Sequence, residues 1–179
     1  MNTKKVVITG GPGTGKSSII NELMSRGFDC FEEISRQVTL DARKNGVDQL
    51  FLTQPLLFSE LLLEGRLNQF KAANSTESDL VFLDRGIPDV LAYMDYADSS
   101  FPKSFTQTCK NNSYDKVFIA APWEDIFESD SERYESFDQA KKIHSQLINT
   151  YKYYNYELID IPFGSISNRT DFILDVLNQ

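Results

Sequence analysis

The sequence contains little cysteine and histidine, on which zinc sites, disulfide scaffolds and many acyl-transfer mechanisms depend. Its 179 residues include two cysteines, Cys30 and Cys109, and one histidine, His144. Three such ligands cannot complete a four-ligand structural zinc site without help from carboxylates. A Ser-His-Asp or Cys-His mechanism would have a single histidine to use as its base. The composition therefore points away from zinc and histidine chemistry.

Long apolar runs are also absent from the sequence. No stretch reaches the roughly 18 apolar residues that a membrane-spanning helix requires. The first residues, Met-Asn-Thr-Lys-Lys, lack the apolar run and the small-residue cleavage site of a signal peptide. We therefore expect a cytoplasmic protein with reduced thiols and no membrane partner.

Acidic residues outnumber basic ones. The chain has 18 lysines and arginines against 26 aspartates and glutamates, which gives a net charge of −8. Because sequence-independent binding to nucleic acid needs a lysine- and arginine-rich surface, we expect no general nucleic-acid binding. The hydrophobic share of 41% and the charged share of 25% are those of an ordinary globular protein. Together with the length, they predict a single domain over residues 1–179.

Strand-like and helix-like segments alternate along the chain, which predicts an α/β fold with a parallel sheet. In the long helix, Thr53 is the expected N-cap, and Pro55 is tolerated in the first turn. Ser136 followed by Gln139 is a capping-box pattern at the start of a later helix. Strands are expected at residues 5–9, 28–32, 80–83, 116–120 and 156–161. Helices are expected at residues 16–25, 53–73, 88–97, 101–110 and 170–177. Two more are expected, one that follows the second strand and ends at residue 43, and one that begins at residue 136.

The strongest motif is Gly-Gly-Pro-Gly-Thr-Gly-Lys-Ser at residues 10–17, which fits the pattern G-x-x-x-x-G-K-[ST] of a phosphate-binding loop. It lies between a predicted strand and a predicted helix, as that motif requires. Its backbone N–H groups would surround phosphate oxygens at a helix N-terminus. Lys16 would reach the β- and γ-phosphates, and the Ser17 hydroxyl would ligate Mg²⁺. The residues predicted to bind ATP are Gly11, Pro12, Gly13, Thr14, Gly15, Lys16, Ser17 and Ser18.

Two carboxylates follow predicted strands and are candidates for the same edge of the sheet. Asp84 ends the most apolar strand, where it would hold Mg²⁺ with Ser17, or cap the helix that starts near Pro88. Glu33 ends the second strand and would act as a general base or as an anchor for an acceptor hydroxyl, with Arg36 guiding an anionic group. The alternative for Glu33 and Arg36 is a salt bridge on a solvated helix.

Four blocks in this order resemble the NadR-like family of P-loop proteins. They are the phosphate loop, Glu33-Ile-Ser-Arg36, Leu80-Val-Phe-Leu-Asp84-Arg85-Gly86 and Tyr156-Glu-Leu-Ile-Asp-Ile-Pro162. That family includes a ribosylnicotinamide kinase domain and predicted ATPases, and it is related to nucleoside and nucleoside-monophosphate kinases. The resemblance implies a three-layer P-loop NTPase fold with a five-stranded parallel sheet of order 2-3-1-4-5, a lid and Mg·ATP binding. It also makes Asp84-Arg85-Gly86 the second acidic motif of the kinases.

The resemblance places the lid at about residues 123–138. From Glu124 to Asp138 this segment has seven acidic residues and one basic residue, Arg133. Small-molecule kinases usually place arginines here to stabilise the transferring phosphoryl group. Arg133 is therefore a candidate catalytic residue, and a solvated acidic surface is the alternative for the rest. The loop at residues 162–165 is implied to contact adenine, and no role is assigned to Arg169.

Three functions are compatible with these residues. The first is a Mg·ATP-dependent phosphotransferase acting on a small hydroxyl-bearing acceptor, such as a nucleoside. Its catalytic residues would be Lys16, Glu33, Asp84 and Arg133, and Glu33, Arg36, Arg85 and Asp89 would lie near the acceptor. The second is an ATPase or nucleotide-dependent switch that acts through a protein partner, although the chain is too short for a complete AAA+ module. The third is an inert nucleotide binder. A homodimer is left open, and ATP is favoured over GTP because an Asn-Lys-x-Asp guanine motif is absent.

Overall fold

The structure is a computed structural model that describes residues 3–127 and 135–178. Its centre is a five-stranded sheet in the order β2-β3-β1-β4-β5, and every neighbouring pair is parallel. This confirms the predicted fold and strand order. The strands are β1 (Lys4–Gly10), β2 (Asp29–Phe31), β3 (Leu80–Asp84), β4 (Lys116–Ala120) and β5 (Leu158–Ile161).

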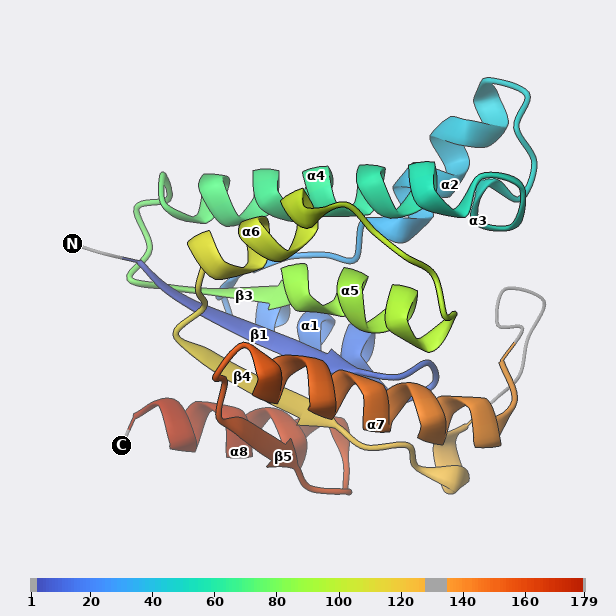
Figure 1. The fold of residues 1–179 in the computed structure, drawn as a ribbon. Helices are drawn as coiled ribbons and strands as arrows, with labels where there is room; N and C mark the ends of the chain where they lie inside the picture. The colour runs from blue at the N-terminus through green and yellow to red at the C-terminus, as the bar shows by residue number, and fades with distance from the viewer. Residues whose placement is uncertain (1–2, 128–134, 179) are drawn as a thin grey trace.

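Helices cover both faces of the sheet, which makes three layers (Figure 1). One face packs against α4, α5, α6 and α7, and the other face packs against α1 and α8. The helices are α1 (Lys16–Ser25), α2 (Ser35–Lys44), α3 (Leu50–Thr53), α4 (Pro55–Ala73), α5 (Ile87–Tyr96), α6 (Lys103–Asn111), α7 (Phe137–Tyr153) and α8 (Ile166–Leu177), and a 3₁₀ turn spans Glu124–Ile126.

The apolar character of β1 follows from its place in the middle of this arrangement. Val6 and Ile8 face α1 and α8, whereas Val7 faces the layer of α5 and α7. All three side chains are fully buried. A strand covered on both faces needs a continuous β-branched run rather than an alternating pattern. The sequence of β1 is therefore that of a central parallel strand.

The start of the long helix differs from the prediction. Thr53 is the last residue of α3 rather than the N-cap of the following helix, and Gln54 separates α3 from α4 with φ −141° and ψ 66°. The residue before a proline is disfavoured in the helical region, so Pro55 starts a new helix and does not extend the preceding one. The last helix also begins earlier than predicted, at Ile166, after the N-cap Ser165.

The parallel strands bring the predicted site residues to one edge of the sheet. Ile8 of β1 pairs in register with Asp84 of β3, and Phe31 of β2 pairs with Leu83. Asp84 therefore lies at the carboxyl end of β3, and the phosphate loop and the segment after β2 follow the carboxyl ends of neighbouring strands, where ligands bind in open α/β sheets. In the described part of the chain, no helix is long and apolar enough to cross a membrane.

Candidate active site

The phosphate loop joins β1 to α1 with two glycines in the left-handed region. Gly13 has φ 70° and Gly15, the N-cap of α1, has φ 80°. Added Cβ atoms at these positions would lie 2.7 Å from the Phe127 ring and 2.7 Å from Arg169 Nη1. The loop therefore requires glycine both for its backbone and for its close neighbours. Its amides lead into the N-terminus of α1, which favours an anion.

Lys16 lies inside this loop rather than in solvent. Its Nζ donates to the Gly11 carbonyl at 2.7 Å and contacts Thr14 Oγ1 at 3.2 Å. Burial lowers the pKa of Lys16 to about 7, and the nearby Arg85 guanidinium adds to the decrease. Phosphate oxygens beside the ammonium would reverse that shift, because an opposite charge favours the protonated form. The side chain is thus placed to respond to a bound polyphosphate.

Ser17 and Asp84 form the predicted metal-binding pair. Ser17 Oγ donates to Asp84 Oδ2 at 3.4 Å, which is a long hydrogen bond. The other carboxylate oxygen, Oδ1, is buried and has no hydrogen-bond partner within residues 3–127 and 135–178. Burial raises the pKa of Asp84. A hydroxyl and an under-satisfied carboxylate fit Mg²⁺, which takes few protein ligands and completes its shell with phosphates and water.

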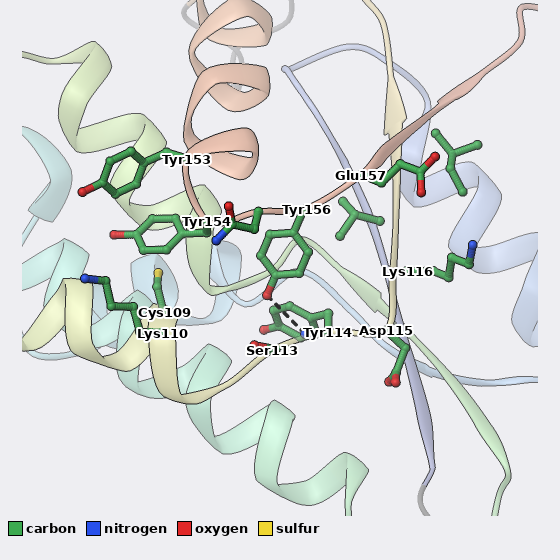
Figure 2. A pocket seen from close by; sticks show the side chains of 13 residues that line it. Cys109, Lys110, Ser113, Tyr114, Asp115, Lys116, Tyr153, Tyr154, Tyr156 and Glu157 are labelled. Atoms are coloured by element: carbon green, nitrogen blue, oxygen red, sulfur yellow. Dashed lines mark hydrogen bonds between the residues drawn. The ribbon is translucent and has the colours of Figure 1, made fainter.

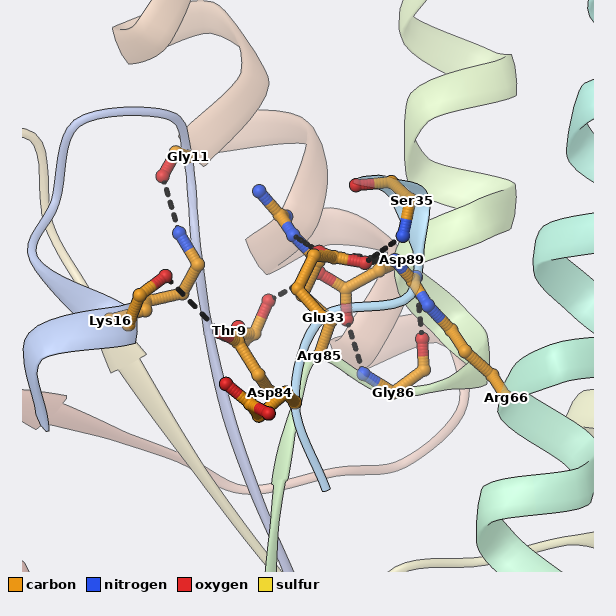
Figure 3. A network of polar contacts seen from close by, with 12 residues as sticks. Thr9, Gly11, Lys16, Glu33, Ser35, Arg66, Asp84, Arg85, Gly86 and Asp89 are labelled. Carbon is orange, nitrogen blue, oxygen red and sulfur yellow. Dashed lines mark hydrogen bonds and ion pairs between the residues drawn. The ribbon is translucent and has the colours of Figure 1, made fainter. Parts of the chain in front are cut away.

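Glu33 faces two arginines across the carboxyl edge of the sheet (Figure 3). Its Oε1 lies 3.1 Å from Arg66 Nη2 and accepts from the Ser35 amide at 3.2 Å, and its Oε2 pairs with Arg85 Nε at 2.5 Å. Burial alone would raise the pKa of Glu33, but the two guanidiniums outweigh it and the pKa is about 2. Glu33 is therefore a charged hydrogen-bond acceptor at neutral pH.

Arg85 and Asp89 connect Glu33 to the interior. Arg85 has φ 73°, an unusual conformation for a residue other than glycine. Its Nη1 lies 3.2 Å from Asp89 Oδ1, and its guanidinium lies over the Tyr93 ring at 5.1 Å. Asp89, predicted to lie near the acceptor, is fully buried and contacts that side of the site through Arg85.

The structure gathers most of the predicted residues but not all. Lys16, Ser17, Glu33, Asp84 and Arg85 meet at one place, as the shared electrostatic interactions of Lys16 and Asp84 with this group indicate. Arg36 lies in the first turn of α2 and is exposed. Arg133 is outside the described residues, so its catalytic assignment stays a prediction.

Two buried arginines are given little or no weight by sequence reasoning. Arg66 is 4% exposed and donates to the Gly86 carbonyl at 3.0 Å while pairing with Glu33. The sequence feature that could have identified Arg66 is the presence of an arginine inside an otherwise leucine-rich helix. Arg169 is 3% exposed and donates to the Thr14 carbonyl at 2.9 Å, so it supports the phosphate loop from α8. Nothing local in the sequence identifies that contact.

Aromatic residues follow β4 and β5, and one of them, Phe127, lies beside the phosphate loop. The rings of Trp123 and Phe163 stack with centroids 5.0 Å apart, and Phe163 is 56% exposed. From the same segment as Trp123, Ile126 and Phe127 approach Gly15 and Gly13. The described start of the predicted lid therefore packs against the loop.

A separate hollow of about 450 Å³ lies at the opposite edge of the sheet. It is bordered by the starts of β4 and β5 and by tyrosines that include Tyr114, Tyr154 and Tyr156 (Figure 2). The Tyr114 amide donates to the Tyr156 hydroxyl at 3.2 Å across it. Its lining lacks the charged cluster and the phosphate loop, so the chemistry is assigned to the carboxyl edge.

Comparisons with known proteins agree with this geometry. A family model for an AAA domain matches residues 5–169, nearly the whole chain. The chain belongs to this AAA domain family. A comparison with curated protein sequences finds no match.

The chain also resembles solved kinase structures. Deoxyadenosine kinase from M. mycoides, with dCMP and dCDP products, is 17% identical with a TM-score of 0.69, over 97% of this chain and 98% of that one. NadR protein in complex with NAD and AMP-PNP is 18% identical with a TM-score of 0.72, over 98% of this chain and 49% of that one. Thymidylate kinase from Candida albicans is 16% identical with a TM-score of 0.65, over 99% and 92%. The chain is thus a P-loop protein with a nucleotide-kinase-like fold, and it spans about half the length of NadR.

Proposed function

We propose that this protein is a Mg·ATP-dependent phosphotransferase that phosphorylates a hydroxyl of a small uncharged acceptor, such as a nucleoside. The observation that carries the proposal is the ionised Glu33 carboxylate. Arg66 and Arg85 hold it at the same strand edge as Lys16, Ser17 and Asp84. A hydroxyl acceptor needs such an oxygen, because the hydroxyl donates a hydrogen bond as it approaches phosphorus.

On the nucleotide side, the loop residues from Gly11 to Ser18 hold the phosphates. Lys16 neutralises charge on the β- and γ-phosphates. Ser17 and Asp84 hold Mg²⁺, which when bound neutralises the phosphate charge and orients the γ-phosphoryl group. Arg133 stays the predicted additional positive charge near that group, and the stacked pair of Trp123 and Phe163 is a candidate support for adenine.

On the acceptor side, Glu33 aligns the attacking hydroxyl. With a pKa of about 2, its carboxylate is a weak base, so we assign it orientation rather than early proton removal. This assignment suits phosphoryl transfer, in which positioning and electrostatics supply most of the catalysis. The hydroxyl proton leaves late, after the new bond to phosphorus has largely formed, when it is acidic enough to pass to the Glu33 carboxylate and from there to water.

The charge balance favours an uncharged acceptor over a monophosphate. The guanidiniums of Arg66 and Arg85 already face the carboxylates of Glu33 and Asp89. A phosphate group placed here would have to compete with Glu33 and would be repelled by it. The predicted role of Arg36 in guiding an anionic group is not part of this proposal, because the proposed acceptor is uncharged.

An ATPase or switch is the second candidate. The predicted lid contains seven acidic residues and the single Arg133, which is little positive charge for fast transfer. A switch would act through a partner, and α2 to α4 expose several leucines, among them Leu40, Leu52 and Leu56. In that case hydrolysis would be slow and independent of any acceptor.

The test is ADP formation from Mg·ATP, measured alone and with panels of nucleosides, nucleoside monophosphates and other small hydroxylic metabolites. Mass spectrometry would identify any phosphorylated product. We expect a nucleoside-type acceptor to stimulate ADP formation and to gain one phosphate, with Lys16→Ala inactive. Slow hydrolysis that no acceptor changes would favour the switch instead.

A further inference from the structure

A fully buried carboxylate lies behind the acceptor side of the site. Asp89 accepts hydrogen bonds from three groups: Thr9 Oγ1 at 2.6 Å, the Tyr151 hydroxyl at 2.5 Å and the Gly86 amide at 2.9 Å. Its fourth contact is Arg85 Nη1 at 3.2 Å. In Figure 3, dashed lines join this carboxylate to Thr9 of β1 and to Gly86 after β3. Asp89 therefore joins β1, α7 and the turn after β3.

Keeping this charge in the core requires a dedicated set of donors. A buried carboxylate is costly unless it is paired and hydrogen-bonded. Tyr151 is among the largest fully buried side chains, and a phenylalanine would fill nearly the same volume. Tyr151 lies near the C-terminal end of α7, and its hydroxyl donates a hydrogen bond to Asp89 of α5. The turn is shaped around this contact, because a Cβ on Gly86 would lie 2.7 Å from the Tyr151 hydroxyl.

The group that Asp89 holds is itself in a strained conformation. Arg85 has φ 73°, and its amide donates to the Ile8 carbonyl at 3.0 Å. Such backbone strain persists only where the surroundings over-determine it, and it is common at functional sites. Asp89 contacts one end of this guanidinium while Glu33 contacts Nε. The buried carboxylate thereby fixes the direction in which Arg85 faces Glu33.

We propose that Asp89 is a positioning residue and that the hydroxyls of Tyr151 and Thr9 are what hold it in place. This inference rests on the proposed function, since it deepens the assignment of Glu33 as the group that aligns the acceptor. Thr9 directly precedes the phosphate loop, so the same carboxylate links the strand that carries that loop to the arginine that orients Glu33. The buried Asp89 carboxylate thereby fixes the positions of ATP and of the acceptor relative to each other.

The test removes each hydroxyl without changing side-chain shape. Tyr151→Phe and Thr9→Val remove donors to Asp89, and Tyr153→Phe and Thr9→Ser are the matched controls. Tyr153 lies on the same helix and is 72% exposed, and serine keeps the donor of Thr9. Asp89→Asn is the stronger variant, and the two hydroxyl deletions keep the proposal testable if that variant does not fold.

The first readout does not depend on activity. NMR of carboxyl-labelled glutamate, with Glu33→Gln used to assign the signal, follows the ionisation of Glu33. We expect its pKa to rise by about one unit in Tyr151→Phe and in Thr9→Val, because Arg85 then faces Glu33 less well. The control variants should titrate like the parent protein. An unchanged Glu33 titration in both hydroxyl deletions would overturn the proposal.

The second readout separates positioning from stability. We expect acceptor turnover to fall about tenfold in the two hydroxyl deletions, with ATP binding changed less than about twofold. Equal losses of ATP affinity and acceptor turnover, with an unchanged pKa of Glu33, would show that Asp89 and its donors only stabilise the fold. If no acceptor is phosphorylated, the proposed function fails, while the Glu33 titration still decides whether Asp89 positions Arg85.

Discussion

The nucleotide side and the acceptor side of this site are built in different ways. The nucleotide side is a continuous loop whose contacts come largely from backbone groups and from Lys16 within the same eight residues, 10–17. The acceptor side is a set of charged side chains from β2, α4 and the turn after β3, supported by α7. The loop suits phosphate groups in general, whereas the choice of an acceptor would depend on the side chains of the second region. Substitutions on the two sides should therefore have separable effects.

Removing the lysine of the loop should have the largest effect. Lys16→Ala should lower phosphoryl transfer by about 10³-fold, because it removes a preorganised positive charge at the reacting phosphates. The measurement is the rate of ADP formation with thermal unfolding in parallel. Lys71→Ala, at an exposed lysine in the last turn of α4, is the control. A Lys16→Ala protein that is folded and active would contradict the assignment of the nucleotide side.

Removing the acceptor-side carboxylate should come next. Glu33→Gln should lower acceptor turnover by about 10²-fold while leaving ATP binding nearly unchanged. The same change frees the guanidiniums of Arg66 and Arg85, so monophosphate acceptors should improve relative to uncharged ones. Parallel steady-state kinetics with a nucleoside and its monophosphate test both statements. Loss of ATP binding together with turnover would show that the two sides are not separable.

A substitution in the predicted metal-binding pair, Ser17 and Asp84, should lower the affinity for Mg²⁺. Asp84→Asn should raise the Mg²⁺ concentration needed for half-maximal activity by about 10- to 100-fold, because a neutral amide replaces the carboxylate that binds the ion and its water. A titration of activity against Mg²⁺ at saturating ATP measures this shift. An unaltered Mg²⁺ dependence would exclude Asp84 as the metal-binding residue.

The pH dependence should affect the nucleotide side alone. The pKa of Lys16 is about 7 in the protein, and bound phosphates would raise it. Below pH 7 the lysine is already protonated, so ATP affinity should be nearly flat. Above pH 7 binding must take up a proton, so the Kd for ATP should rise by up to about tenfold per pH unit. Calorimetry in two buffers of different ionisation enthalpy would detect that proton, and Lys16→Ala should abolish it.

The two sides also differ in how far sequence alone predicts them. The phosphate loop is contiguous, so its pattern, its strand and its helix are all visible locally, and α1 has the predicted bounds. Asp84 and Glu33 are found because each follows a strand, and parallel strands end at one edge. The sheet order is correctly implied by the family resemblance, and the structure confirms it.

The remaining contacts depend on side chains that are distant in sequence. Arg66 lies 33 residues from Glu33, and Tyr151 lies 62 residues from Asp89. No local pattern states which buried polar groups will pair, because pairing follows from the packing of α4, α5 and α7. The start of α4 at Pro55, two residues later than predicted, is different, because the restriction on the residue before a proline could have placed that boundary.

The most direct test of the central claim compares a nucleoside with its own monophosphate as acceptor. The initial rate of ADP formation from Mg·ATP would be measured with each member of several such pairs. Our account predicts that at least one nucleoside stimulates ADP formation tenfold or more while its monophosphate does not. A monophosphate that is preferred, or hydrolysis that no acceptor changes, would contradict the proposed orientation of an uncharged acceptor by Glu33.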